Sequence, residues 1–390
     1  MVASNPVPYM APLMRKLAQH PQVELRVAYC SLRGIEGGLD PEFGRDVKWD
    51  VPLLDGYEWT QVPNKGSGED NFWGLNNPGL KEIIHDGKID AVLCYTGYVR
   101  ASFWIARRAA KKTKAAFIFG TDTWTIEPRD GKAWKRWFKR ILWPIVFGLA
   151  DQAIVSSIKG REMLASIGIP EQKITHTPPC VDNDWWMEQA AKIDRVVERE
   201  KFGITKSERV VLFCAKLQPW KGPMDLLRAF AKARVPDSRL IFAGEGPQRP
   251  DLEREAKRLG IENQVLFLGF VNQSYLPGLY KLVDLMVLPS LYEPFGMVVN
   301  EAMCCGCPVM ASDQVGATPE LVSAIAPDFV FVAADVASLA SRLSAVMNDP
   351  ERLAQMRDKV VAHIEGWSPA HNIEATFRAA EIAVARIRGR

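Results

Sequence analysis

The sequence predicts an α/β protein built from two doubly wound, mainly parallel sheets. The chain has 390 residues, which is more than a single hydrophobic core usually holds, so two domains are expected. Apolar runs of strand length alternate with helical stretches in both halves, as in successive βαβ units. These runs are almost continuously apolar, which is typical of strands buried on both faces.

The C-terminal half shows this alternation most clearly. Helices are expected between successive strands, as parallel pairing requires. The expected strands are 210–215, 240–243, 265–268, 285–288, 309–311 and 329–332. The expected helices are 224–233, 252–259, 275–282, 295–304 and 336–347.

The N-terminal half repeats the pattern less regularly. Only residues 1–4 precede the turn Asn5-Pro6-Val7-Pro8, so either the first strand is unusually short or the true start lies upstream. A polar, helix-rich stretch at 184–206 is expected to connect the sheets, and a last helix begins near 367. We therefore predict an N-terminal domain of residues 1–185 with the returning helix 367–390, and a C-terminal domain of residues 207–366. The other expected N-terminal strands are 23–28, 91–94, 115–119, 152–155 and 174–177.

Composition indicates a soluble globular protein, with 47% hydrophobic and 24% charged residues. No uncharged apolar run is long enough to span a bilayer and no secretory signal is apparent, so a cytoplasmic location is expected. Seven cysteines are present, and only Cys304 and Cys307 stand at C-x-x-C spacing. Because no second pair completes a zinc site, reduced and buried thiols are expected, and no metal.

Positive charge is concentrated between residues 100 and 140. This stretch holds twelve Lys and Arg against three acidic residues, an excess of 12 − 3 = +9. Nucleic acid or an anionic membrane would each explain such a patch.

The strongest functional pattern is the segment 289–303, Pro-Ser-Leu-Tyr-Glu-Pro-Phe-Gly-Met-Val-Val-Asn-Glu-Ala-Met. Pro294 stands where a helix is expected to begin, since proline suits the first turn. The amides of Gly296, Met297 and Val298 would then point from a helix N-terminus, which is a natural phosphate site.

Two carboxylates accompany this expected helix start. Glu293 and Glu301 lie about 12 Å apart along a helix axis at 1.5 Å per residue, so they can contact different parts of one extended ligand. The alternative is that Glu293 is an ordinary helix-start acid and Glu301 a solvated residue.

The whole pattern resembles the retaining glycosyltransferases of the GT-B fold, specifically glycosyltransferase family 4. The resemblance rests on Glu293-x7-Glu301 followed by the turn Gly306-Cys307-Pro308-Val309. It extends with specific motifs from about 210 to 322 and more loosely over the whole chain. The further motifs are Lys216-Leu217-x3-Lys221-Gly222, Gly244-Glu245-Gly246-Pro247, Leu268-Gly269-Phe270-Val271, and Ala311-Ser312-Asp313 with Gly316 and Pro319-Glu320.

The resemblance implies a fold of two Rossmann-like domains that face each other across a cleft. It also implies the reaction that the protein catalyses. A hexosyl group would move from a UDP- or GDP-linked sugar to an acceptor hydroxyl with retention of anomeric configuration. Lys216 and Lys221 would hold the diphosphate, Glu301 the ribose hydroxyls, and Glu293, as a catalytic residue, would face the donor sugar. The remaining implied donor-binding residues are Gly246, Val271, Gly296, Met297 and Val298.

The same resemblance implies no cofactor or metal, because the nucleotide sugar is a substrate. The resemblance further implies that the acceptor is a saccharide or a lipid-linked molecule, and that the protein acts in surface polysaccharide or glycolipid assembly. The chain departs from the family at Ala215-Lys216, where most members have Gly-Arg, so a point charge replaces a bidentate guanidinium.

The N-terminal half lacks two family features, a Gly-Gly loop near the donor phosphates and a histidine near the sugar. Asp122 in Gly120-Thr121-Asp122-Thr123-Trp124 occupies the comparable region. Asp122 is therefore either a catalytic contact to the sugar or acceptor hydroxyl, or a turn aspartate.

A basic amphipathic helix is expected from residue 132. Its apolar positions 134, 137, 138, 141, 142 and 145 share one face, and Pro144 should kink or end it. One interpretation is contact with a membrane or acceptor at the inner face of the membrane. The other is that the apolar face docks on the N-terminal sheet and leaves the basic face in water. The residues concerned are Trp134, Lys135, Arg136, Trp137, Lys139 and Arg140.

Four other functions compete with glycosyl transfer. A nicotinamide-dependent oxidoreductase needs G-x-G-x-x-G, and the best fragment has Arg249 at the third glycine. A GT-B epimerase or phosphorylase shares the expected architecture. A nucleic-acid-binding protein would use the 100–140 stretch, although we expect no nucleic-acid partner. An inactive relative is disfavoured because Glu293 and Glu301 are both retained.

Overall fold

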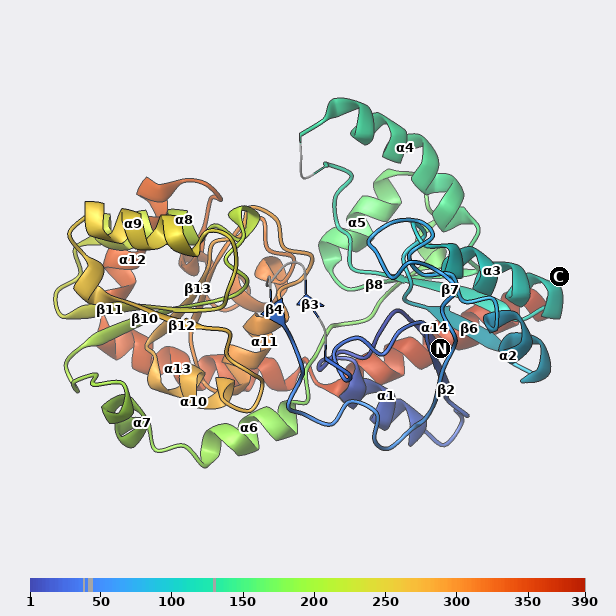
Figure 1. The fold of residues 1–390 in the computed structure, drawn as a ribbon, viewed down its shortest axis with the longest axis horizontal. Coiled ribbons are helices and arrows are strands. Elements are labelled where there is room, and N and C mark those ends of the chain that lie inside the picture. Colours follow the sequence, from blue (N-terminus) through green and yellow to red (C-terminus); the bar gives the residue numbers. More distant parts are fainter. Residues whose placement is uncertain (38, 41–44, 129–130, 390) are drawn as a thin grey trace. The chain divides into compact units, whose positions relative to one another are not determined.

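The computed structural model describes every residue except 38, 41–44, 129–130 and 390 (Figure 1). Arg129 and Asp130, which were counted in the basic stretch, lie outside the described residues. Backbone contacts divide the chain into two compact units. Unit 1 comprises Met1–Glu36, Pro52–Pro179 and Pro369–Arg390, and unit 2 comprises Gly37–Val51 and Cys180–Ser368.

This division differs in two places from the domain boundaries expected from the sequence. The stretch expected to be a connection, 184–206, packs on unit 2, where Trp186 is buried. The segment 37–51 also belongs to unit 2. There the Asn272 side chain donates to the Lys48 carbonyl at 2.9 Å, and the Ser274 amide donates to the Asp50 carboxylate at 3.2 Å.

Unit 2 contains a six-stranded parallel sheet in the order β12-β11-β10-β13-β14-β15. Its central strands β13 and β14 are buried along their whole length, which is why they are apolar at nearly every position. The strands are β10 (Arg209–Cys214), β11 (Ser238–Ala243), β12 (Val265–Gly269), β13 (Leu285–Leu288), β14 (Val309–Ser312) and β15 (Val330–Phe331).

Helices cover both faces of this sheet (Figure 1). On one face lie α8 (Pro223–Ala233), α9 (Arg249–Arg258) and α12 (Val336–Met347). On the other lie α6 (Asn183–Ala191), α7 (Arg195–Lys201), α10 (Leu276–Leu282), α11 (Met297–Cys304) and α13 (Pro350–Glu365). Aspartates cap several of these helices, such as Asp335 at α12 and Asp349 at α13, and satisfy amides that the helix leaves unpaired.

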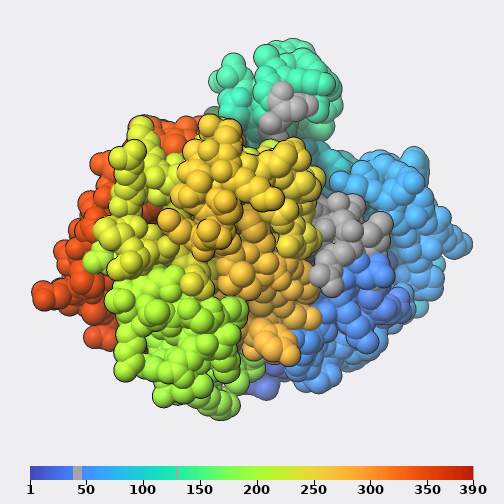
Figure 2. Space-filling view, turned by 60° about the vertical axis from the view of Figure 1, so that its left-hand side comes forward, coloured from blue at the N-terminus to red at the C-terminus, as the bar shows by residue number. Residues whose placement is uncertain are grey.

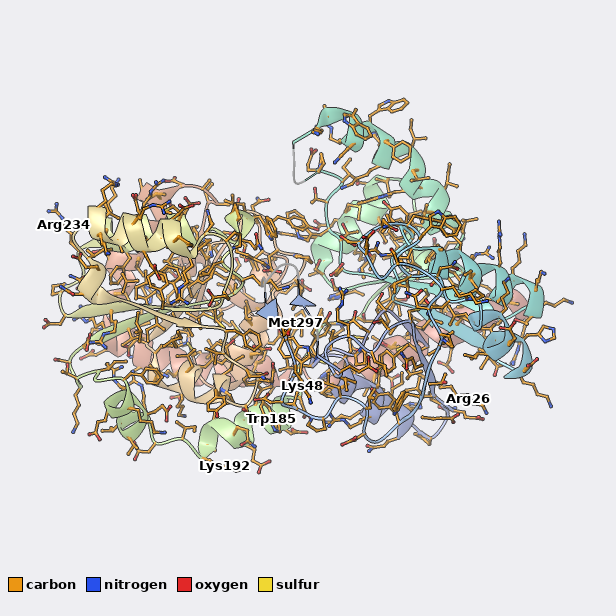
Figure 3. The ribbon with its side chains drawn as sticks, viewed as in Figure 1. Arg26, Lys48, Trp185, Lys192, Arg234 and Met297 are labelled. Atoms are coloured by element: carbon orange, nitrogen blue, oxygen red, sulfur yellow. The ribbon has the colours of Figure 1, made fainter. Side chains whose placement is uncertain are left out.

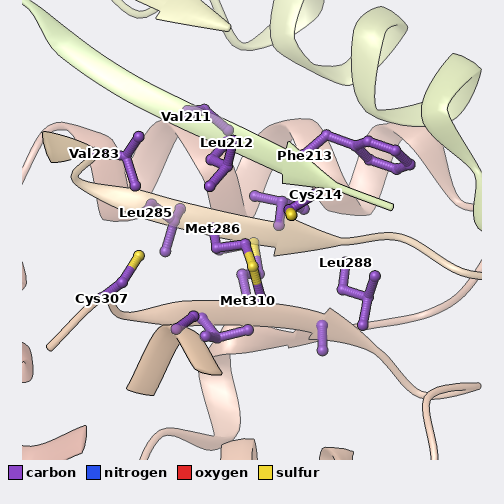
Figure 4. Close-up of a cluster of buried hydrophobic side chains, with 14 of the residues drawn as sticks. Val211, Leu212, Phe213, Cys214, Val283, Leu285, Met286, Leu288, Cys307 and Met310 are labelled. Carbon is purple, nitrogen blue, oxygen red and sulfur yellow. The ribbon is translucent and has the colours of Figure 1, made fainter. Parts of the chain in front are cut away.

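The core of unit 2 lies between this sheet and its helices. Figure 4 shows aliphatic and sulfur side chains from β10 and β13 meeting Met310 and Cys307, all of them buried. All seven cysteines of the chain are buried thiols without a disulfide, as expected from the sequence. Burial raises the pKa of Cys307 to about 12, so this thiol stays protonated and unreactive at neutral pH.

Unit 1 contains a seven-stranded parallel sheet in the order β5-β2-β1-β6-β7-β8-β9. The first strand, β1, has only two residues and lies at the centre of the sheet. The edge strand β5 is exposed at every position, so it carries no apolar pattern and was not predicted. The strands are β1 (Val2–Ala3), β2 (Arg26–Tyr29), β5 (Glu58–Gln61), β6 (Ala91–Cys94), β7 (Ala116–Thr121), β8 (Gln152–Val155) and β9 (Ile174–His176). A separate antiparallel pair, β3 (Leu39–Asp40) and β4 (Arg45–Asp46), lies in the segment assigned to unit 2.

Helices also cover both faces of the unit 1 sheet. One face carries α1 (Ala11–Ala18) and the C-terminal helix α14 (Pro369–Arg388). The other carries α2 (Leu80–Asp86), α3 (Ala101–Thr113), α4 (Ala133–Gly148) and α5 (Ile158–Ser166). The predicted fold class, two doubly wound α/β units, is confirmed.

Of the two outcomes expected at Pro144, a kink or a helix end, helix α4 excludes the end. The helix runs through this proline to Gly148 instead of ending at it, and packing of Val146 and Phe147 beyond it accompanies this continuation. Along the described residues, no helix has the length and apolar character required to cross a bilayer.

Candidate donor site

The strand order of the unit 2 sheet reverses between β10 and β13. Strands β10 and β13 are neighbours, but the chain leaves β10 toward one side of the sheet and leaves β13 toward the other. In open parallel sheets, ligands bind beyond the carboxyl ends of the strands at such a point. The segments that follow β10 and β13 are therefore the natural place for a ligand site.

The segment after β10 carries Lys216 and Lys221, and backbone contacts fix its course. The Leu217 amide donates to the Glu245 carbonyl at 2.9 Å, and the Gln248 amide donates to the Leu217 carbonyl at 3.1 Å. Both lysines are half-buried. Gly246 lies in the segment after β11, and a β-carbon there would come within 2.6 Å of the Leu217 carbonyl oxygen. The structure thus places Gly246 directly against the lysine-bearing segment.

The segment after β13 carries Glu293 and leads into α11. Its start corrects the sequence expectation, because α11 begins at Met297 and Pro294 precedes it. Gly296 is the N-cap, with a φ of 97° that only glycine adopts easily. The backbone amides of Met297, marked in Figure 3, and Val298 lie in the first helical turn. Amides in the first turn of a helix suit an anionic group, so their role in donor binding stays a prediction.

Lys221 and Glu293 form an ion pair that joins these two segments. Their side chains are only 17% and 12% exposed, respectively, so solvent screens the attraction less than at an open surface. The Leu291 amide also donates to the Trp220 carbonyl at 2.8 Å. The residues predicted for the diphosphate and for the sugar are therefore coupled to each other.

Glu301 lies on α11 and is 7% exposed. The Tyr280 hydroxyl donates to one carboxylate oxygen at 2.9 Å, and the Gln273 amide donates to the other at 3.5 Å. Burial raises the pKa of Glu301 to about 7, and these two hydrogen bonds act against that rise. The alternative that Glu301 is a solvated residue is therefore wrong.

Gln273 and Tyr280 were not identified from the sequence. Tyr280 is fully buried in a helix whose apolar neighbours gave no functional signal. Gln273 belongs to a short polar run that reads as a loop. A buried hydroxyl opposite a carboxylate becomes visible only once α10 and α11 are placed side by side.

Val271 lines a cavity of about 550 Å³ that is bounded by the end of β12, α7 and α10. Phe270, Asn272 and Tyr275 from the same segment also line it, together with Lys48 from the segment 37–51. Trp49 approaches Phe270 with ring centroids 6.1 Å apart. This cavity offers aromatic and polar groups beside Val271, which the family resemblance assigns to donor binding.

Asp122 follows β7 in unit 1 and is exposed. Its carboxylate interacts electrostatically with the Tyr9 phenol, which belongs to the loop after β1. It thus lies beyond the carboxyl end of a unit 1 strand, where a ligand contact is expected. Its predicted catalytic role stays a prediction.

The first turns of α4 expose apolar residues that the docked interpretation expected to be covered, whereas Leu142 packs against the core of unit 1. Trp134 and Trp137 are 64% and 67% exposed, and Arg136 forms an exposed ion pair with Glu127 at 3.2 Å. Lys135 and Lys139 lie over the rings of Trp134 and Trp143, respectively. Arg140 is exposed. The apolar face of the first part of this helix does not pack on the sheet.

Comparison with known proteins places the chain in a family. The family model described as "Glycosyl transferases group 1" matches residues 194–361, and that described as "Glycosyltransferase Family 4" matches residues 37–185. The chain belongs to glycosyltransferase family 4. The first of these matches contains every residue predicted for donor binding.

Curated relatives of this family 4 chain match it over part of their length. A D-inositol 3-phosphate glycosyltransferase of Nocardia farcinica is 31% identical over 250 residues, 62% of this chain and 54% of that protein. An uncharacterized glycosyltransferase of Methanocaldococcus jannaschii is 40% identical over 174 residues, 44% of each chain. A GDP-mannose-dependent α-(1-6)-phosphatidylinositol monomannoside mannosyltransferase of Mycolicibacterium smegmatis is 30% identical over 263 residues, 65% of each chain. The chain thus spans about half the length of the first of these relatives, 54%.

Solved structures share the architecture over nearly the whole chain. HepE of Anabaena in complex with UDP superposes with a TM-score of 0.72 at 18% identity, covering 97% of this chain and 98% of that one. A glycosyltransferase of Rickettsia africae superposes with a TM-score of 0.73 at 16% identity, covering 98% and 97%. These similarities confirm the GT-B fold that the sequence predicted.

Proposed function

We propose that this family 4 chain is a retaining glycosyltransferase that moves a hexosyl group from a UDP- or GDP-linked sugar to an acceptor hydroxyl. The observation that carries the proposal is the convergence of Lys216, Lys221, the first turn of α11 and buried Glu301 beyond one edge of the unit 2 sheet. Cations and a helix N-terminus suit a diphosphate, and a carboxylate suits the hydroxyls of a ribose.

The relatives support a nucleotide-sugar donor. The Anabaena protein HepE was crystallised with UDP and with UDP-glucose, and the mannosyltransferase of Mycolicibacterium smegmatis depends on GDP-mannose. Neither base is favoured by a residue described above, so the proposal keeps both.

The proposed mechanism assigns charge stabilisation to the chain itself. As the bond from the sugar to the diphosphate breaks, negative charge grows on the departing phosphate. Lys216, Lys221 and the amides of α11 would stabilise this charge, without need of a metal or cofactor. Glu293 would contact the sugar while holding Lys221 toward the phosphate. The acceptor hydroxyl would attack from the leaving-group side, which retains the anomeric configuration, with Asp122 as the proposed contact in unit 1.

The proposed acceptor is a saccharide or a lipid-linked molecule, in surface polysaccharide or glycolipid assembly at the cytoplasmic face of a membrane. Two names among the similar proteins support this class. One is the mannosyltransferase that acts on a phosphatidylinositol monomannoside. The other is WaaG, a glycosyltransferase involved in lipopolysaccharide biosynthesis.

Thermal unfolding with nucleotides tests the donor site. UDP, GDP, ADP and their sugars are added to wild type, Lys216→Ala and Glu301→Ala, with the exposed-residue variants Lys257→Ala and Glu262→Ala as matched controls. A ligand at about 100 times its Kd adds roughly 2.7 kcal/mol of stability. We expect one nucleotide family to stabilise wild type and both controls but neither site variant. An absence of any nucleotide effect on folded wild type would reject the proposal.

Product analysis then tests the reaction class. The stabilising nucleotide sugar is incubated with candidate acceptors, and the anomeric configuration of the product is read by NMR. Transfer with retention is expected. Release of free sugar or an isomerised sugar without an acceptor would indicate an epimerase or phosphorylase-like chemistry on the same fold.

A further inference from the structure

The feature of α4 that the fold leaves unexplained is a continuous apolar stripe that faces solvent. Large apolar side chains recur along it at spacings of three and four residues, which places them on one face of a helix. Its members are Trp134, Trp137, Phe138, Ile141 and Ile145, with exposed fractions of 64%, 67%, 51%, 48% and 59%. Single exposed apolar residues are common on proteins, but a contiguous set of this size marks an interaction surface. We call this set the α4 stripe.

The stripe is exposed although α4 itself is firmly packed. Trp143, Val146 and Phe147 are buried and lie on the side of the helix opposite the stripe. The Trp143 ring nitrogen donates to the Tyr98 hydroxyl at 2.8 Å, and Phe147 stacks on Phe119 with centroids 5.1 Å apart. The last turns therefore anchor the helix, and the first turns project from unit 1 (Figures 1 and 2). Because α4 is anchored in this way, loose packing of the helix does not explain why the α4 stripe is exposed to solvent.

Basic residues border the stripe. From 131 to 148 the sequence contains five Lys and Arg and no Asp or Glu. At about 100° per residue, Lys135 and Arg140 lie on opposite flanks of the stripe, and Lys139 lies farther round. The long aliphatic parts of these side chains allow their charged groups to stay in a polar environment when a partner covers the stripe. The surface therefore combines exposed aromatic and aliphatic side chains with positively charged side chains along its edges.

This combination favours a lipid surface over a second protein copy. Two copies joined through the stripe would bring ten cations together without an acid from either helix. An anionic bilayer supplies the opposite charge together with an apolar layer at the correct depth for Trp. The helix is about 24 Å long at 1.5 Å per residue, and its cations exclude a spanning orientation.

We propose that α4 docks unit 1 on the interface of an anionic lipid bilayer, with the α4 stripe inserted among the headgroups and Lys135 and Arg140 on lipid phosphates. Docking depends only on α4, and it gives the proposed transferase an acceptor carried in the membrane. The proposed partner is a surface of negatively charged phospholipids in general, not one particular lipid species.

Vesicle sedimentation of the full chain tests the proposal. Vesicles of phosphatidylcholine alone are compared with vesicles that also contain phosphatidylglycerol, at low and high salt. We expect binding to the anionic vesicles that weakens as salt rises. Trp134→Ser with Trp137→Ser should weaken binding at every salt concentration. Lys135→Glu with Arg140→Glu should weaken it on the order of tenfold or more at low salt.

A control with the same change of charge isolates the site. Lys232→Glu with Lys257→Glu changes exposed residues of unit 2 and should leave vesicle binding unchanged. Each variant must unfold at the wild-type temperature, a check that requires no nucleotide, so failure of docking and failure of the donor site are read separately. The proposal would be overturned if the wild-type protein did not bind anionic vesicles. It would also be overturned by a stripe variant that binds normally, or by one whose only effect is to dissociate a dimer or release bound nucleic acid.

Discussion

Glu301 shows how a single carboxylate is prepared for a ligand by its surroundings. Its side chain is almost completely buried, yet it receives hydrogen bonds from Tyr280 and Gln273. Burial raises its pKa to about 7 from the ordinary value of 4.5, because a charged group loses hydration in the interior. In the folded protein the neutral form is favoured, so this group lowers stability progressively as pH rises from about 4.5 to 7.

This shift predicts that nucleotide binding depends on pH. Ribose hydroxyls donate to a charged carboxylate, so affinity should increase as pH rises through about 7. Nucleotide affinity at pH 6 should be roughly tenfold lower than at pH 8, because at pH 6 about one site in ten is ionised. Calorimetric titration at a series of pH values measures this. Glu301→Gln should bind more weakly and lose the dependence; an unchanged profile in that variant would assign the titration to another group.

Tyr280 is predicted to position Glu301 and to set its ionisation. Tyr280→Phe keeps the ring but removes the hydrogen bond of 2.9 Å to the carboxylate. Since that bond lowers the pKa of Glu301, its loss should move the midpoint of the affinity profile to higher pH. At pH well above the new midpoint, affinity should recover toward the wild-type value. A uniform loss at every pH would mean that Tyr280 only supports packing.

At the scale of elements, the start of α11 depends on one glycine. Gly296 has a φ of 97°, and a β-carbon there would lie 3.1 Å from Leu288, 3.2 Å from Glu293 and 3.3 Å from Val315. A side chain would therefore meet both backbone strain and close neighbours. The first amides of the helix, on which the proposed phosphate contact rests, would have to move.

Gly296→Ala is therefore expected to cost more than an alanine at a comparable glycine. Gly260 has a φ of 70° and open space around it, so Gly260→Ala should cost only the backbone strain, about 1 kcal/mol. Gly296→Ala should cost at least about 1 kcal/mol more and should also weaken nucleotide binding. Urea unfolding and nucleotide titration of the two variants measure both effects. Equal losses of stability would show that the crowding around residue 296 relaxes freely.

Strands with a continuous apolar sequence were predictable, and the strand without one was not. Strands β6, β8 and β13 match their expected bounds because every position is apolar or nearly so. Strand β5 has the exposed sequence Glu-Trp-Thr-Gln, which carries no such signal. At Pro144 local chemistry permits a helix end, but α4 continues through the proline because the following turn packs in the core.

The candidate site divides in the same way. Lys216, Lys221, Glu293 and Glu301 stand in motifs with fixed spacing, so the sequence could group them. The ion pair between Lys221 and Glu293 and the contact from Tyr280 to Glu301 join residues far apart in the chain. No local pattern encodes such pairs, because they arise only when neighbouring elements pack.

At the scale of the whole molecule, the chain passes between its units after residues 36, 51, 179 and 368. The two-domain organisation followed from length and the repeated strand–helix pattern. The assignment of 37–51 to unit 2 did not, because it depends on hydrogen bonds from Asn272 and Ser274 that no periodicity indicates. The final helix returns to unit 1, where Arg386 donates to the Asp151 carbonyl and the Gln152 side chain, each at 2.7 Å.

This return makes the C-terminal helix part of the core of unit 1, and the consequence can be measured. Ala383 is fully buried against the sheet together with Ile118 and Ile154, whereas Ala385 on the same helix is exposed. Ala383→Asp should destabilise unit 1 by about 3 kcal/mol or more, because it buries an unpaired charge. Ala385→Asp should change stability by less than about 0.5 kcal/mol.

Calorimetric unfolding with and without the stabilising nucleotide assigns this effect to a unit. If the units unfold separately, the transition that the nucleotide raises belongs to unit 2, and Ala383→Asp should lower the other one. Nucleotide stabilisation should survive in that variant, because the residues that carry the proposed donor site all lie in unit 2. Loss of both transitions together would instead mean that unit 2 depends on unit 1 for its stability, and that the chain folds as one cooperative body.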